Sequence, residues 1–486
     1  MYSLRLLDDS AGVANGTFLL WTDLLPQLTY LFRPNTSCRL ATLLSHTPFF
    51  TYKQKISLHN LAVLTGFIAN TTGQRAFRVG TDASSWMCRA CALHGNTESP
   101  ELVALFGRCA RLFGLPFIPI FVFDGPLRPS MKRGKIVKGN DHWLTKSFQL
   151  MLEGFGFDWI TAPSAMSSTG VPCRSDAILT DDSDAFVSGA EMVLQICSED
   201  NRNYSASQYS RLGLTRYDFI LIALLAGGDY SDGLDGCGIT TAVGLAQAGL
   251  GCQLFQGLNG LSYTDSSACL NQWRLALQSD TDMYPALAAK IPDNFPALDI
   301  IHLYLHPIVA HGSTPASLSL NSPRLDVLAR FAEAHFAWGD SVGILTHFAD
   351  RLFAGLVVRG LVHAALALDD PHSFPSSFSP PPTIGSIVGD RAHISTGFLA
   401  ELRLVPQIGP DLLRSALNSI EGRRDAAAGA QAAVSEWINN RLPKARASLH
   451  RHVPRGRSAN ARSRVFTVTH HGQEVLELIS DSDGEL

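Results

Sequence analysis

The stretch Phe117-Ile-Pro-Ile-Phe-Val-Phe123 is followed directly by Asp124 and Gly125. An uninterrupted apolar run of this length, ended by turn-forming residues, predicts a strand that is buried on both faces. Such strands are typical of parallel sheets whose two sides are covered by helices. Asp124 is therefore expected at the carboxyl end of a central strand, which is where α/β proteins bind their ligands.

The segments on either side of this strand alternate between strand-like and helix-like patterns. Phe77–Gly80 predicts a strand that leads into Asp82, and Ala177–Leu179 predicts another before an acidic cluster. Apolar residues at helical spacing predict helices over Trp86–His94, Leu102–Leu112 and His142–Phe155. Strands that alternate with helices predict an α/β fold with a mostly parallel sheet.

Acidic residues recur at such element ends, and five of them form the candidate metal site: Asp82, Asp124, Asp182, Asp184 and Asp229. Because the carboxyl ends of parallel strands meet at one edge, we expect these side chains to converge. Hard oxygen ligands suit Mg²⁺ or Mn²⁺, and two such ions ~4 Å apart clamp a phosphodiester during attack by water. On a strand-like segment Asp182 and Asp184 would point the same way, and a cation between them would offset their repulsion. The alternative for this pair is a polar turn.

A glycine-rich turn follows Tyr217–Ala226, which we predict to be a helix within a mostly helical region over residues 212–310. Gly233, Gly236 and Gly238 permit a tight turn whose backbone N–H groups face outward. Thr240 and Thr241 then begin the next helix. Such a turn binds phosphates without reading sequence, so we expect these five residues to contact DNA. The alternative is an ordinary connection between two helices.

A basic stretch follows Asp124 and is placed to hold phosphates beside the metal site. Its members are Arg128, Lys132, Arg133, Lys135, Lys138 and Lys146. The alternative is a solvated helix face. The chain as a whole does not share this character, because its formal net charge is −4. Any surface that binds nucleic acid must therefore be local.

Other features exclude several classes of protein. No apolar run of ~18 residues is present, so we expect no membrane partner. The opening Met1–Asp9 carries acids where a signal peptide is basic and then apolar. Unpaired cysteines fit a reducing compartment. Cys88 and Cys91 have the spacing of zinc ligands, but no second pair follows, so we assign them to a helix.

Four ordered motifs resemble the XPG/flap-endonuclease family of structure-specific nucleases. They are VGTDASSW at 79–86, VFDGPLRPSMKRGK at 122–135, ILTDDSDAFVSGA at 178–190 and LLAGGDYSDGLDGCG at 224–238. The short segment between GKIVKGNDHWLTK, at 134–146, and the next helix is most similar to that of the Holliday-junction-resolvase (GEN-type) branch. The resemblance implies a PIN-like core with two Mg²⁺ ions at the carboxylate cluster and a helix–turn–helix element that grips duplex DNA through a monovalent cation. It also implies metal-binding roles for the five acids and contact with the scissile phosphate for Lys132.

The chain departs from this family in two places. Family members carry a Glu-Ala-Glu-Ala helix before the acid pair, whereas the matching stretch here, Ala162–Arg174, has no carboxylate. They also begin Met-Gly-Ile or Met-Gly-Val, whereas this chain begins Met-Tyr-Ser.

We therefore expect a Mg²⁺-dependent endonuclease for flaps or junctions in repair or recombination, with an incomplete metal site. The alternative is a weak or inactive relative that binds branched DNA as a scaffold. A third hypothesis is a dehalogenase-like phosphatase, because Gly228–Asp232 resembles the late acidic motif of that family. The only candidate for the early nucleophile pair of that family, Asp182 and Asp184, lies so close to this motif that little of the chain is left for the rest of the fold.

The predicted organisation has five parts. They are an uncertain N-terminal segment at 1–55, a PIN-like nuclease core at 56–200, a helix–turn–helix region at 201–310, a region of unknown fold at 326–440 and a disordered tail at 441–486. Ser/Pro-rich linkers are predicted at 311–325 and 369–386. Eight Lys or Arg and no acid lie in residues 441–464, which suits nuclear import. Val475–Ile479, followed by acids, resembles a SUMO-interacting motif.

Overall fold

Strand β3 (Phe117–Phe123) lies inside a seven-stranded sheet with the order β1-β9-β8-β7-β2-β3-β6. The computed structural model describes residues 51–477, with gaps at 70–74, 93–97, 128–130, 133–134, 137–141, 165–174, 183, 199–204, 212–213, 261–262, 281–284, 306–319, 370–382, 393–398, 423–429, 443–446, 453–465 and 471–472. The remaining strands are β1 (Thr51–Ser57), β2 (Phe77–Asp82), β6 (Asp158–Thr161), β7 (Ala177–Leu179), β8 (Met192–Ser198) and β9 (Ser205–Arg211).

The sheet is mostly parallel, as predicted. β8, β7, β2, β3 and β6 run in one direction, whereas β9 and β1 add an antiparallel edge. β2, β3 and β7 match the predicted strands closely, and all seven residues of β3 are buried. The two antiparallel strands were not predicted, and most of the predicted N-terminal segment 1–55 lies outside the described residues.

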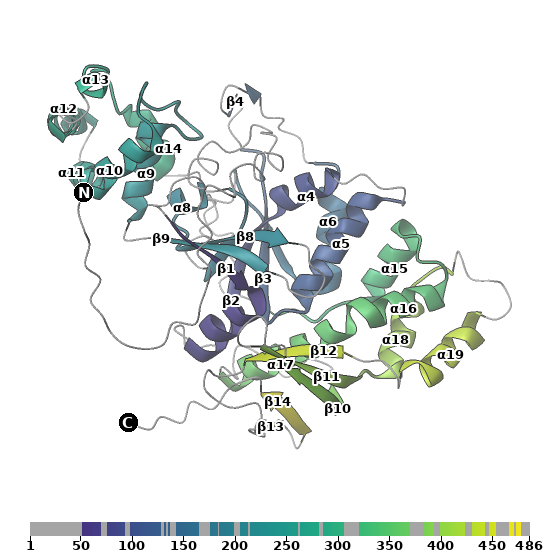
Figure 1. The fold of residues 1–486 in the computed structure, drawn as a ribbon. Coiled ribbons are helices and arrows are strands. Elements are labelled where there is room, and N and C mark those ends of the chain that lie inside the picture. The colour runs from purple at the N-terminus through teal and green to yellow at the C-terminus, as the bar shows by residue number, and fades with distance from the viewer. Residues whose placement is uncertain are drawn as a thin grey trace, which may run out of the picture. The chain divides into compact units, whose positions relative to one another are not determined.

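Helices cover both faces of the sheet because alternate strand residues point to opposite sides. Phe121 and Phe123 join one apolar cluster, and Val122 between them joins another. The first cluster contains α4 (Ala83–Cys91), α5 (Pro100–Phe113) and α6 (Thr145–Phe155), and the second contains α8 (Asp184–Val187) and α9 (Arg216–Ala226). Figure 1 shows the sheet between these two sets of helices. The three helices predicted between the strands are therefore confirmed.

The second cluster continues into the predicted helical region, which is also confirmed. Its further members are α10 (Ile239–Gln247), α11 (Leu250–Leu258), α12 (Tyr263–Asp280), α13 (Pro285–Ala288) and α14 (Leu298–Leu305). Helix α9 begins at a capping box, in which Thr215 accepts from the backbone of Asp218 and the Asp218 carboxylate accepts in return. Such a cap satisfies two backbone donors that the first helical turn leaves open. It fixes the start of the helix whose other end leads into Asp229.

The region at 326–440 packs into the first cluster with α4–α6. Its helices are α15 (Leu325–His335), α16 (Ser341–Arg351), α17 (Phe353–Asp369), α18 (Pro410–Leu417) and α19 (Ala430–Asn440). Arg359 of α17 is 1% exposed and donates a hydrogen bond of 2.7 Å to the carbonyl of Phe117. Its guanidinium also lies over the rings of Phe113 and Phe157. These contacts join α17 to the central strand β3.

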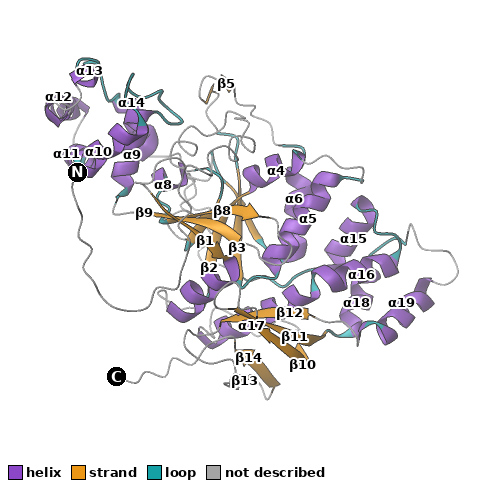
Figure 2. Cartoon of the chain, in the orientation of Figure 1, coloured by secondary structure: helices purple, strands orange, loops and turns teal. Residues whose placement is uncertain are grey.

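Smaller elements complete the described chain, as the strands and helices of Figure 2 show. They are α3 (Leu58–Leu61), a π-helix at Ala62–Ala69, β4 (Met131–Lys132), β5 (Lys135–Ile136), β10 (Thr383–Ala392), β11 (Leu399–Gln407), β12 (Ala447–His452), β13 (Phe466–His470) and β14 (Gln473–Glu477). Within the predicted tail at 441–486, β12 pairs with β11 and β13 pairs with β14. Val475–Glu477 thus belongs to β14, and Leu478 and Ile479 lie outside the described residues.

No single helix among the described residues has the length and apolar character of a membrane span. The bent pair α16 and α17, which meet at 53°, passes that test together by length and composition. Both helices contribute buried residues to the apolar cores.

Candidate metal centre

Asp82 lies at the carboxyl end of β2 and caps the N-terminus of α4. Its Oδ1 accepts from the backbone N–H of Ser85 at 3.1 Å, and its Oδ2 accepts from the hydroxyl of Thr180 at 3.1 Å. Thr180 follows β7, the strand beside β2 in the sheet. A short polar residue at an N-cap satisfies an open backbone donor of the helix. Both hydrogen bonds hold the carboxylate at the predicted edge of the sheet.

Three more of the predicted acids meet one another. Carboxylate oxygens of Asp182, Asp184 and Asp229 lie within 4.8 Å of each other. Asp182 follows β7, Asp184 is the first residue of α8, and Asp229 follows α9. These three acids lie together, but Asp182 and Asp184 do not do so through alternation along a strand, as the sequence predicted. The strand ends at Leu179, and the two acids come together across the start of a helix instead.

The charges of these acids link the two parts of the site. Loss of water around the Asp82 carboxylate raises its pKa to about 7, and the charge of Asp124 and then that of Asp182 add to this increase. The hydrogen bonds from Ser85 and Thr180 act against it. Burial also raises the pKa of the Tyr304 hydroxyl, and the charges of Asp184 and Asp229 contribute. Asp82 thus lies near enough to Asp124 and Asp182, and Tyr304 near enough to Asp184 and Asp229, for these charges to act on them.

Tyr304 is a member of this centre that the sequence did not indicate. It lies on α14 and is 6% exposed, and its ring packs against that of Tyr230 at an interplanar angle of 70°, with 4.9 Å between centroids. Its hydroxyl lies so close to Gly228 that a side chain there would overlap it. Tyr304 follows Asp229 by 75 residues in an apolar helix, so no local motif marks it.

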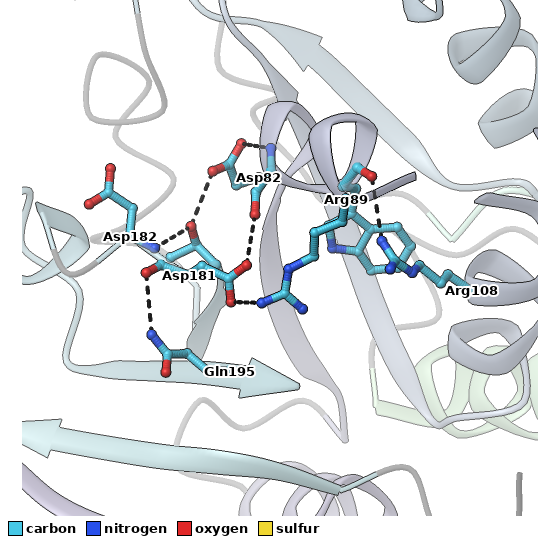
Figure 3. A network of polar contacts seen from close by, with 9 residues as sticks. Asp82, Arg89, Arg108, Asp181, Asp182 and Gln195 are labelled. Atoms are coloured by element: carbon cyan, nitrogen blue, oxygen red, sulfur yellow. Dashed lines mark hydrogen bonds and ion pairs between the residues drawn. The ribbon is translucent and has the colours of Figure 1, made fainter. Parts of the chain in front are cut away.

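Polar contacts also surround Asp181, the residue before Asp182 (Figure 3). Asp181 forms an ion pair with Arg89 of α4 and accepts from the Ser85 hydroxyl at 3.2 Å. Its carbonyl accepts from the side chain of Gln195, on β8, at 3.3 Å. Arg89 lies two helical turns after Asp82, on the same side of α4. The ion pair therefore ties the helix capped by Asp82 to the loop that carries Asp182.

The donor set suits a hard divalent cation. Carboxylate oxygens gathered this closely repel one another unless a cation lies between them. Mg²⁺ and Mn²⁺ prefer such oxygen ligands and bind through a few carboxylates together with water and phosphate. The residues present thus fit the metal that the sequence predicted.

The predicted glycine turn is present, and its glycines serve two purposes. Gly233 and Gly236 adopt φ values of +82° and +83°, which side chains disfavour. A Cβ on Gly233 would lie 2.5 Å from the backbone nitrogen of Gly227, so Gly233 is required for packing. Gly236 and Gly238 are exposed, and Gly238 caps α10. Thr240, also exposed, and Thr241 lie in the first turn of that helix.

Comparison with known proteins agrees with this geometry. No protein-family model matches the chain. DNA repair protein RAD2 of Saccharomyces cerevisiae is 26% identical over 209 residues, which are 40% of this chain and 19% of that protein. Flap endonuclease GEN-like 1 of Arabidopsis thaliana is 31% identical over 203 residues, which are 34% of both proteins. The Holliday junction-resolving enzyme GEN1, solved with product DNA and Mg²⁺, shares the fold with a TM-score of 0.54 at 25% identity, over 72% of this chain and 84% of that one. A junction-resolving enzyme GEN-1 with bound potassium gives a TM-score of 0.55 at 25% identity, with the same coverage.

The chain is a relative of the XPG/GEN-type flap endonucleases. The predicted resemblance and the PIN-like α/β fold are thereby confirmed. The chain spans between about a fifth and a third of the length of these two curated relatives.

Two stretches that matter to the predicted site lie wholly or partly outside the described residues. Residues 165–174, where the sequence lacks the Glu-Ala-Glu-Ala pattern, are among them. So are Arg128, Arg133 and Lys138 of the basic stretch. Lys132 and Lys135 belong to the paired strands β4 and β5, and Lys146 is exposed on α6. The predicted phosphate contacts of this stretch stay predictions.

Proposed function

We propose that this chain is a Mg²⁺-dependent, structure-specific DNA endonuclease that cleaves branched DNA at flaps or junctions in repair or recombination. The observation that carries the proposal is the gathering of Asp182, Asp184 and Asp229 from three elements, with oxygens within 4.8 Å. Their position at the carboxyl edge of a parallel sheet, in a relative of nucleases, favours phosphodiester hydrolysis over a structural role for the acids.

Each group of residues at the site would have a separate role in cleavage. Bound Mg²⁺ or Mn²⁺ would supply an activated water and would neutralise charge on the phosphate. Asp182, Asp184 and Asp229 would hold one cation, and Asp82 and Asp124 would complete the site for a second. Ser85 and Thr180 orient the Asp82 carboxylate through the two 3.1 Å hydrogen bonds. Lys132, followed by Arg133 and Lys135, would neutralise the scissile phosphate.

The turn from Gly233 to Thr241 would bind the duplex part of the DNA, at a distance from the phosphodiester that is cleaved. Exposed backbone at Gly236 and Gly238, before the N-terminus of α10, suits phosphate oxygens of any sequence. A junction-resolving enzyme GEN-1 has been solved with bound potassium, and we propose that a monovalent cation binds at this turn of the present chain. We also propose that the protein acts in the nucleus, where its DNA substrate lies, and that the basic residues of 441–464 contribute to import. SUMO binding by Val475–Ile479 stays a prediction.

The experiment uses labelled flap, four-way-junction and linear duplex DNA with Mg²⁺, Mn²⁺ or EDTA. We expect metal-dependent cleavage of at least one branched substrate and none of the linear duplex. Equal cleavage of branched and linear DNA would contradict structure specificity. Binding of branched DNA without cleavage at any metal concentration would contradict the endonuclease.

The second candidate function is a scaffold that binds branched DNA with little or no cleavage. It is favoured by the absence of a carboxylate from Ala162–Arg174, which leaves fewer hard ligands for a second cation. The double change Ala165→Glu and Ser167→Glu tests this reading. A gain in Mg²⁺-dependent cleavage would show that the missing acids limit turnover. Strong cleavage by the unchanged chain at low Mg²⁺ would show that other groups compensate and would reject the scaffold.

A further inference from the structure

The helical region that carries the glycine turn is acidic, which is unexpected for a surface that holds DNA. Residues 214–305 contain nine Asp, no Glu and only three Lys or Arg. Attraction to phosphates depends on local positive charge, because each neutralised phosphate releases bound counterions. The turn itself, residues 228–247, contains three acids and no Lys or Arg. Any basic side chain that serves this turn must therefore come from another part of the chain.

Two of the three cations in this region bind backbone carbonyls inside the fold. Arg216 donates to the carbonyls of Val187 and Tyr304, at 2.9 Å and 3.0 Å. Arg274 donates to the carbonyl of Phe295 at 2.8 Å and to the side chain of Asn271 at 2.9 Å. Both guanidinium groups thus form hydrogen bonds that join helices and connections within the fold.

Lys290, the third cation, lies at the glycine turn. It follows α13, and its backbone N–H donates to the carbonyl of Leu287 at 2.9 Å, which closes a tight turn. Its ammonium lies 2.7 Å from Oδ2 of Asp235 and 3.5 Å from the place where a Cβ on Gly236 would stand. The side chains of Lys290 and Asp235 are 49% and 88% exposed. The ammonium thus stands in solvent, beside the exposed backbone of the turn.

We infer that Lys290 is the basic side chain with which the glycine turn holds a duplex phosphate, in addition to the proposed monovalent cation, and that Asp235 occupies its ammonium until DNA binds. This inference rests on the proposed function, since it assigns a charge to the DNA-binding turn. A lysine ammonium has three donors on a flexible stem, so it can turn from a carboxylate to a phosphate. Exposed ion pairs are weak and are screened by salt, so a phosphate can displace Asp235.

The electrostatics of the pair agree with such an exchange. The hydrogen bond from Lys290, together with its charge, lowers the pKa of Asp235. Asp235 therefore stays ionised near neutral pH and competes with the phosphate for the ammonium. The alternative is that the ion pair only fixes the shape of the turn. The two readings make opposite predictions for the loss of Asp235.

The experiment measures binding of a fluorescently labelled flap DNA to the full chain in Ca²⁺ or EDTA, over a series of salt concentrations. Lys290→Gln should weaken binding several-fold, equally for different sequences, and should lower the slope of log affinity against log salt by about 0.9. Asp235→Asn should strengthen binding, because the competitor is gone. The double variant should bind as Lys290→Gln does. Arg414→Gln is the matched control, because Arg414 forms a similar exposed ion pair with Asp411 on α18.

The outcomes separate this inference from the proposed function. Weaker binding by Asp235→Asn, with unchanged salt slope for Lys290→Gln, would show that the pair only shapes the turn and would overturn the inference. Unchanged binding by Lys290→Gln beside weakened binding by Gly236→Val would reject Lys290 and keep the turn as a DNA contact. Unchanged binding by both variants would remove the turn itself from the DNA interface. Thermal unfolding of each variant identifies any loss of binding that comes from misfolding.

Discussion

The backbone N–H of Asp184 donates a hydrogen bond of 3.1 Å to Oδ1 of Asp182. The bond bends the chain between the end of β7 and the start of α8, so that two residues two positions apart present carboxylates to the same point. A residue that follows a strand and accepts from the chain two residues on is a common way to start a turn. Here it places two acids beside Asp229, and the cluster would be stable only where a cation or a proton offsets the repulsion.

Removal of one acid should therefore separate catalysis from folding. Asp184→Asn keeps the backbone N–H that donates to Asp182 but removes a charged ligand. We expect Mg²⁺-dependent cleavage of branched DNA to fall by at least about 100-fold, because the two-cation arrangement depends on ligand charge. Binding measured in EDTA should change little. Asp411→Asn, at an acid 95% exposed on α18, is the matched control and should cleave normally. Unchanged cleavage by Asp184→Asn would exclude Asp184 as a ligand.

Much of this site was predictable because its residues follow buried elements. The run Phe117–Phe123 identified a central strand, and the parallel arrangement then brought Asp82, Asp124 and the Asp182 cluster to one edge. The antiparallel strands β1 and β9 were missed, since TYKQKIS and SASQYSR are largely polar and resemble loops. Tyr304 and the Arg89–Asp181 pair were missed because each depends on a contact between segments far apart in sequence.

Loss of the proton from Asp82 should make the metal-free protein less stable as the pH rises. Its pKa is about 7 in the folded chain and 3.8 as an ordinary carboxyl, so the folded state binds the proton more tightly. Stability from this group is therefore fully present below pH ~4 and is lost as the pH rises through 7. In EDTA, the free energy of unfolding should fall by up to about 3 kcal/mol between pH 5 and pH 8.

Urea unfolding of the wild type and of Asp82→Asn, at several pH values in EDTA, checks this dependence. The asparagine keeps an acceptor for the N–H of Ser85 but carries no charge. The difference in unfolding free energy between the two proteins should therefore grow as the pH rises. A constant difference in unfolding free energy between the two proteins from pH 5 to pH 8 would mean that Asp82 titrates below this range. Added Mg²⁺ should reduce the difference at pH 8, since a cation replaces the proton.

The contact between α17 and α5 should be sensitive to a single added carbon. A Cβ on Gly355 of α17 would overlap the ring of Phe113, which is fully buried in the first apolar cluster. Gly355→Ala should lower the free energy of unfolding by about 1–3 kcal/mol, because an overpacked core forces side chains and backbone to shift. Gly244→Ala in α10 is the control, because nothing lies within 4 Å of its added Cβ. Alanine favours a helix over glycine, so that variant should be as stable as the wild type or more so. Equal stability of both variants would show that α17 does not pack closely on α5.

The ion pair between Arg89 and Asp181 should position the acidic loop without touching the substrate. Arg89→Gln removes the partner of a carboxylate that is 37% exposed and adjacent to Asp182. We expect cleavage to fall by about 10-fold to 100-fold, which is typical for groups that orient metal ligands. The double variant Arg89→Gln with Asp181→Asn removes the unpaired charge and should recover part of the loss. Ser85 and Gln195 would still hold the loop, through the Asp181 side chain and carbonyl respectively.

The decisive measurement for the Arg89–Asp181 pair is the Mg²⁺ concentration that gives half-maximal cleavage. A purely structural role would lower thermal stability but would leave this Mg²⁺ concentration unchanged. If Arg89→Gln lowers stability while its Mg²⁺ dependence matches the wild type, the pair supports the fold and does not position the acids.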